Sequence, residues 1–222
     1  NGINVQAGIL TAKNIIDASD AQRNTRVGGN AGNSFDGTTA TDNTLIGYDA
    51  GTAITTGDRN TAVGSYALDA NTTASNNSAL GYLALSANTT GGDNTAMGTY
   101  ALDVNTTGDK NTAIGVAALS ENTTGDKNTG LGAYALSNAT TGDNNTAVGA
   151  YTLDAVVTGD ANTALGAYAM TANTTGGQNV AIGYDALGDN TTASGSVAIG
   201  YNALTAATTG GENVAIGIAA LE

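Results

Sequence analysis

The residues of this chain best placed to do chemistry are aspartates in Gly-Asp turns, which recur at a regular spacing over part of the sequence. Stacked along a regular fold, their carboxylates would form a row of oxygen ligands of the kind that Ca²⁺ takes. The same Gly-Asp pairs suit ordinary turns, in which Asp hydrogen-bonds to its own backbone. Two of the turns carry a lysine that would oppose a cation, and the G-G-x-G-x-D calcium repeat is absent. Ca²⁺ is therefore kept as an alternative, with candidate ligands Asp109, Asp126, Asp143 and Asp160, and with Asp58 in an equivalent turn.

Catalysis has little support in the residue types present. The chain has no His and no Cys, which removes the commonest acid–base and nucleophilic arrangements. The aspartates recur once per repeat, whereas a catalytic residue is expected to interrupt a repeat once. We therefore predict that the protein is not an enzyme and that it has no cofactor other than the Ca²⁺ alternative.

Three other repeated side chains allow a binding role. A double-Thr column runs from Thr55-Thr56 to Thr208-Thr209, and regular Thr arrays on a β-solenoid can order water as ice does. The two Thr are adjacent, so in an extended segment only one of them faces a given surface. Tyr residues recur one or two positions after a repeated Gly and suit either sugar stacking or packing between coils or chains. Asn105 and Asn122 begin N-T-T triplets that match the glycosylation pattern, but the repeat itself accounts for the triplet.

The composition excludes several classes of partner. The net charge is −13 with only six basic residues, so binding to a phosphate backbone is disfavoured. No run of about 18 apolar residues occurs, so we expect no membrane insertion by this segment. The chain has 32 Gly, no Trp and one Phe. Each short stretch can therefore bury little apolar surface, and ordering needs stacking or partner chains.

The organising feature is a 17-residue repeat. A Gly preceded by an aliphatic residue recurs eleven times between Gly47 and Gly217 at a constant interval, with Leu four positions later in nine of the eleven copies. A weaker copy ends at Gly28, and its distance from Gly47 exceeds the regular interval by two positions. The residues before the repeated Gly form a stripe, here called the aliphatic stripe: Ile46, Val63, Leu80, Met97, Ile114, Leu131, Val148, Leu165, Ile182, Ile199 and Ile216.

This repeat predicts an all-β fold, a parallel β-roll or solenoid of eleven to twelve 17-residue coils. Two apolar stretches per coil, bounded by Asn, Gly or Asp, predict two short strands joined by turns. Like residues stack about 4.8 Å apart, so Asn and Thr ladders can hydrogen-bond between coils, and the rod is roughly 50 Å long. Alternation in T-A-V-G places Ala on a crowded, roll-like interior. Whether the aliphatic stripe or the Leu stripe faces the interior stays open.

The repeat also divides the chain. Residues 1–23 do not fit it and are predicted to form capping or connecting strands. Residues 24–222 form the β-roll repeat domain. Within it, residues 24–42 make an atypical first coil with a two-residue insertion near Ser34–Gly37, and regular repeats occupy 43–222.

The V-A-I-G blocks at Val180–Gly183, Val197–Gly200 and Val214–Gly217 resemble the head repeat of YadA-like trimeric autotransporter adhesins. The resemblance covers residues 24–222 and implies a left-handed parallel β-roll in which three chains pack side by side. The repeats of that family are shorter than the repeat of this chain. The N-T-A-x-G…N-T-T-G form is similar to repeat tracts of phage tail fibres and bacterial surface fibres.

Together these patterns favour a structural or adhesive segment of an extracellular, homotrimeric fibre, on a bacterial cell surface or a virion tail. The expected partners are further copies of the chain and a host-surface glycan or protein, with no nucleic acid. Two alternatives remain: a self-assembling structural filament that binds no ligand, and a monomeric β-solenoid that binds ice or Ca²⁺.

Overall fold

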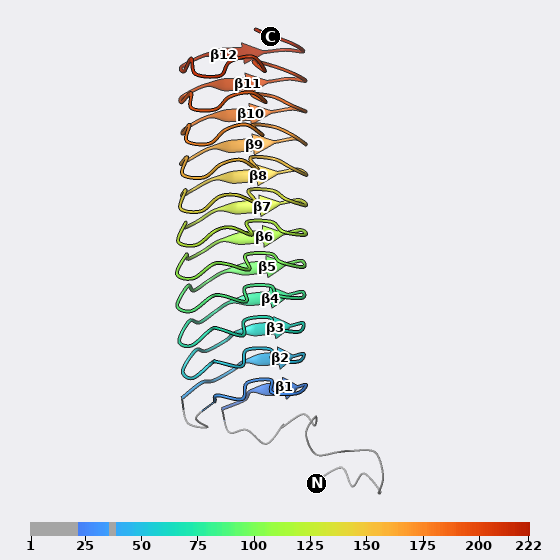
Figure 1. Cartoon of the computed structure of the whole chain (residues 1–222), viewed down its shortest axis with the longest axis vertical. Coiled ribbons are helices and arrows are strands. Elements are labelled where there is room, and N and C mark those ends of the chain that lie inside the picture. The colour runs from blue at the N-terminus through green and yellow to red at the C-terminus, as the bar shows by residue number, and fades with distance from the viewer. Residues whose placement is uncertain (1–21, 36–38) are drawn as a thin grey trace, which may run out of the picture.

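The chain winds into a β-solenoid in which each coil contributes one short strand (Figure 1). The computed structural model describes residues 22–35 and 39–222. Over these residues there is no helix, and twelve strands form one parallel sheet in the order of the sequence. The strands are β1 (Thr25–Val27), β2 (Thr44–Ile46), β3 (Thr61–Val63), β4 (Ser78–Leu80), β5 (Thr95–Met97), β6 (Thr112–Ile114), β7 (Thr129–Leu131), β8 (Thr146–Val148), β9 (Thr163–Leu165), β10 (Val180–Ile182), β11 (Val197–Ile199) and β12 (Val214–Ile216).

The pairing register confirms the period of the repeat. Thr112 of β6 pairs with Thr129 of β7, and every pair from β2 onward repeats this offset. Thr25 of β1 pairs instead with Thr44 of β2, so the first coil is longer than the others by the two predicted residues. The predicted N-terminal strands in 1–23 lie almost wholly outside the described residues.

The prediction of two strands per coil is wrong, because the second apolar stretch is a turn. In the coil of β3, Tyr66 and Leu68 have φ of 60° and 54°, in the left-handed region that a strand does not use. The stretch still hydrogen-bonds to both neighbouring coils: the N–H of Tyr66 donates to the Tyr48 carbonyl and that of Leu68 to the Ala84 carbonyl. The turn has a packing consequence. It buries the consecutive residues Ala67 and Leu68 completely, whereas a strand would send one of them outward.

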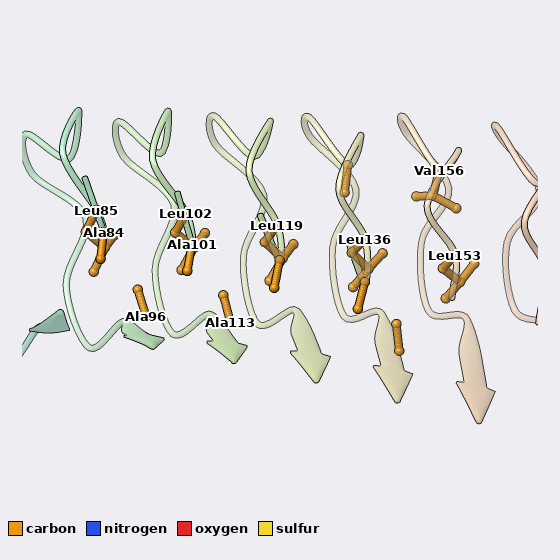
Figure 2. Close-up of a cluster of buried hydrophobic side chains, with 14 of the residues drawn as sticks. Ala84, Leu85, Ala96, Ala101, Leu102, Ala113, Leu119, Leu136, Leu153 and Val156 are labelled. Carbon is orange, nitrogen blue, oxygen red and sulfur yellow. The ribbon is translucent and has the colours of Figure 1, made fainter. Parts of the chain in front are cut away.

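The interior is a narrow channel filled by small and medium side chains. The Ala at the centre of most strands and the Ala-Leu pair of most turns are buried. Figure 2 shows the Leu side chains stacked from coil to coil beside the strand Ala. We name the buried Leu and Met residues four positions after the repeated Gly the leucine column: Leu68, Leu85, Leu102, Leu119, Leu136, Leu153, Met170, Leu187 and Leu204. This column faces the interior, which settles the choice that the sequence left open.

The second coil departs from the repeat and compensates within itself. Gly51 occupies the position that is Leu or Met in the leucine column. In the same coil, Leu45 occupies the position of the strand Ala, and Ile54 occupies a position that is Asn in the next coils. Leu45 and Ile54 are both fully buried. A Cβ on Gly51 would lie 2.8 Å from each of their side chains, so the two larger residues fill the space that the missing Leu leaves.

Buried asparagines join the coils at the corner before each strand from β1 to β10. Asn111 is typical: its backbone N–H donates to Asn94 Oδ1 at 2.8 Å, and its Nδ2 donates to the Gly125 carbonyl at 2.7 Å. The same bonds recur at Asn128, Asn145 and Asn162. Each Asn therefore satisfies backbone groups that the corner would otherwise bury unpaired. This confirms the structural role predicted for the Asn ladder.

Candidate interaction surface

The aliphatic stripe lies on the outside of the solenoid. Each of its residues follows the buried central residue of its strand, so the alternation of the strand turns its side chain outward. Leu131 is 41% exposed and Leu165 is 47% exposed, and no member of the stripe is buried. The strands that carry the stripe are stacked in order from β2 to β12 (Figure 1), so its outward side chains follow one another along the length of the sheet. It is therefore a continuous apolar strip that the single chain does not cover.

The composition of the strip changes along the rod. The other outward residue of each strand, two positions before the stripe, is Thr or Ser from β1 to β9. In β10, β11 and β12 it is Val180, Val197 and Val214. The outer strand face is thus wholly apolar in the last three strands. Contiguous exposed apolar surface of this kind marks sites of association.

A column of tyrosines lies next to the stripe in the chain. All nine Tyr are one or two residues after the Gly that follows each strand, and eight of them are among the most exposed large apolar residues. Rings of neighbouring coils contact one another throughout the two runs of the column, Tyr48 to Tyr100 and Tyr134 to Tyr201. The coil between these runs has Val116 and Ala117 in place of Tyr.

The Gly-Asp turns carry a structural hydrogen bond. Asp126 Oδ1 accepts the backbone N–H of Asp109 at 2.8 Å, and Asp143 Oδ1 accepts that of Asp126 at 2.7 Å. Asp160 does the same for Asp143. Ser75 Oγ takes this place for Asp58 at 3.0 Å, so the position requires an acceptor rather than a charge. Over the described residues, no three His, Cys, Asp or Glu side chains are grouped so that they could hold a metal ion.

The double-Thr column has one inner and one outer member. Thr106 is half-buried and donates its hydroxyl to the Thr123 carbonyl at 3.0 Å, which ties one coil to the next. The second Thr of each pair is exposed in every coil from Thr56 to Thr209. The two Thr therefore differ in environment as predicted, and a single file of hydroxyl-bearing side chains faces solvent.

Asp103 is a site that sequence reasoning missed. Its Oδ1 is buried without a hydrogen-bond partner. Burial, and then the nearby Glu121 carboxylate, raise the pKa of Asp103 to about 6. The equivalent residues Ser86 and Ser120 donate their hydroxyls to the carbonyl one coil ahead, each at 3.2 Å. The sequence signal that could have indicated this site is the replacement of Ser by Asp at one repeat position, with Ser in the coils on both sides.

The two glycosylation-type asparagines lie inside the solenoid. Asn105 and Asn122 are fully buried, and each donates Nδ2 to a carbonyl in its own turn at 3.1 Å. Their amide nitrogens are thus inaccessible in the folded chain. The N-T-T triplet is explained by the turn that it builds.

Comparisons with known proteins do not assign this chain to a family. No protein-family model, curated protein or solved structure matches it. In the part of the chain that the structure describes, no helix has the length and apolarity of a membrane span. The YadA-like resemblance therefore stays a prediction from the repeat motif, while the β-solenoid itself is established.

Proposed function

We propose that this chain is a structural and adhesive segment of an extracellular fibre, in which three copies pack side by side through the aliphatic stripe. The observation that carries the proposal is the position of the stripe. It is apolar in every coil from Ile46 to Ile216, yet none of its members is buried in the single chain. Covering such a strip is favourable, at about 25 cal/mol for each Å² of apolar surface removed from water.

The partner that fits the strip best is another copy of the same chain. A surface that repeats once per coil can be contacted at every rung only by a partner with the same axial spacing. A second copy has that spacing by construction, and closed symmetric assemblies are the common outcome of self-association. The number three and the extracellular setting rest on the resemblance to YadA-like head repeats.

The adhesive part of the proposal rests on repetition. Near-identical coils present the same outer groups many times along one rigid axis, so weak contacts with a host glycan or protein add as avidity. The acidic exterior, with a net charge of −13, opposes uncontrolled side-to-side aggregation. The fibre thus acts by holding shape and by multiple weak contacts rather than by chemistry.

A second candidate, ice binding by a monomer, is favoured by the outer Thr file from Thr56 to Thr209. It requires that the stripe stay uncovered in solution. The outer Thr file presents only one side chain per coil. An extended flat contact with an ice surface needs more than one such file. The two candidates are therefore separated by the oligomeric state.

Charged substitutions on two faces test the fibre proposal. In the double variant Leu131→Lys/Val148→Lys, two adjacent rungs of the stripe become charged. In the control Thr124→Lys/Thr141→Lys, charge is added to the exposed Thr file. Sedimentation velocity is expected to give a smaller assembly for the first variant and an unchanged one for the second, with matching circular dichroism. Equal behaviour of both variants would count against the stripe as the interface.

A further inference from the structure

The tyrosine column contains two kinds of ring contact, and the repeat position decides which occurs. Tyr134, Tyr151 and Tyr168 all lie two residues after the repeated Gly, with φ between 55° and 61°. Their rings are parallel, with centroids 5.1 Å and 5.6 Å apart and interplanar angles of 8° and 5°. Tyr184 and Tyr201 both lie one residue after the Gly and stack at 5.4 Å and 11°.

Where the position alternates, the rings meet edge to face. Tyr82 lies one residue after its Gly and Tyr100 lies two after, and their planes cross at 84°. The other alternating pairs have angles of 63° to 84°. Three stacked pairs and four crossed pairs thus occur on one scaffold, which makes the crossed pairs internal controls for any chemistry of the stacked ones.

Stacking limits what these tyrosines can bind. A sugar ring packs against the face of an aromatic ring, and in Tyr134–Tyr151–Tyr168 the facing surfaces of the rings are already occupied by each other. The outer edges of the rings remain accessible, since these side chains are about 40% exposed. The accessible chemistry is therefore that of the phenol edge rather than of the ring face.

The geometry points to the stacked tyrosines as sites of oxidative phenol coupling, which would link neighbouring coils covalently. Tyrosines at equivalent backbone positions leave the chain in the same direction, so their parallel rings are expected to bring ortho carbons alongside one another. In crossed pairs the edge of one ring points at the face of the other. The chain has no Cys and no Trp, so a tyrosyl radical is not quenched by either of these side chains.

The coupling balances with hydrogen peroxide as oxidant and a haem peroxidase as catalyst. Each phenol loses one electron and one proton to give a tyrosyl radical. The two radicals form one carbon–carbon bond between ortho carbons, and the hydrogens on those carbons move to the oxygens to restore both phenols. The two electrons and two protons reduce one hydrogen peroxide to two waters. No other reactant is needed.

The test is peroxidase oxidation of the folded chain at low protein concentration. Dityrosine fluorescence reports total coupling, and digestion at aspartate separates the partners of each stacked pair, because Asp143, Asp154 and Asp185 lie between them. Cross-linked peptides, two hydrogens lighter than the sum of their parts, are expected for Tyr134–Tyr151, Tyr151–Tyr168 and Tyr184–Tyr201. Denatured chains should stay at 21.6 kDa, which shows that the links lie within one chain.

Two matched variants test whether coupling depends on the stacked geometry or only on the presence of many neighbouring tyrosines. Tyr151→Phe keeps the packing but removes the oxidisable phenol, so it should abolish the first two links and leave Tyr184–Tyr201. Tyr66→Phe, in a crossed run, should leave all three. The inference is overturned if crossed pairs couple as often as stacked ones, if the urea-unfolded chain couples as fast as the folded one, or if the links join different chains. The first two of these outcomes do not depend on the proposed trimer.

Discussion

The side-chain oxygen of Asn122 has no hydrogen-bond donor because the next coil carries Ala139 at the equivalent position. In the coils before it, Asn105 Nδ2 donates to Asn88 Oδ1 and Asn122 Nδ2 donates to Asn105 Oδ1, both at 2.8 Å. The ladder therefore ends at Asn122 with one acceptor buried and unpaired. Such an atom typically costs about 1–3 kcal/mol.

Ala139→Asn is expected to stabilise the chain by about 1 kcal/mol, because the new Nδ2 reaches Asn122 Oδ1 and pairs it. The new Oδ1 can accept the N–H of its own turn, as Asn173 does from Gly176 at 3.0 Å. Urea unfolding measures the change. Ala139→Val is the control, since it adds volume without a donor. A gain from Val equal to that from Asn would show that packing rather than the amide is responsible.

Asp103→Ser is expected to stabilise the chain by about 1 kcal/mol at pH 7.5, after discounting for the partial exposure of the carboxylate. Ser places a hydroxyl donor where Ser86 and Ser120 already use one. Asp103 has a folded-state pKa raised from 3.8 to about 6, so the folded chain binds its proton more tightly than the unfolded chain does. The contribution of Asp103 to the free energy of unfolding is therefore most favourable below pH 4, and it is lost as the pH rises through 6.

The advantage of Asp103→Ser should therefore shrink between pH 7.5 and pH 4.5. Thermal unfolding of both chains at the two pH values measures this difference directly, and effects shared by both chains cancel in it. An advantage that is the same at both pH values would contradict the assigned titration of Asp103.

Gly132→Ala is expected to destabilise the chain by more than about 3 kcal/mol. Gly132 has φ of 138°, and a Cβ there would overlap the carbonyl oxygen of Gly149 in the next coil. Gly217 is the matched control, because its φ is 127° but a Cβ would meet only Ala220 Cβ, at 3.9 Å. Gly217→Ala should cost about 1–2 kcal/mol from backbone strain alone. Equal losses in denaturant unfolding would mean that close coil stacking is not the cause.

Much of the fold follows from sequence pattern, and the exceptions have a common physical origin. The period, the parallel stacking and the longer first coil can be derived from Gly28, Gly47 and their successors, because identical residues must lie above one another. The second strand of each coil was wrongly predicted. Residues such as Tyr66 and Leu68 do not by type favour a positive φ, so nothing local signals the turn that they make.

The orientation of the two apolar stripes could not be predicted for the same reason. Ile114 and Leu119 are equally apolar, and only the turn between them decides that Leu119 is buried while Ile114 stays partly exposed. Asp103 was missed because its burial depends on neighbouring coils. The tyrosine contacts, in contrast, could have been derived from the sequence, since the offset from Gly alone separates stacked from crossed pairs.

The central claim is that copies of this chain associate in threes through the aliphatic stripe, and the native mass of the soluble chain tests it most directly. Light scattering, with and without a chelator, should give three times the 21.6 kDa of the single chain. A mass of 21.6 kDa would contradict the claim and favour a monomeric solenoid. A mass that changes when the chelator is added would indicate that Ca²⁺ is bound. Very large end-to-end species would equally contradict it and favour a filament.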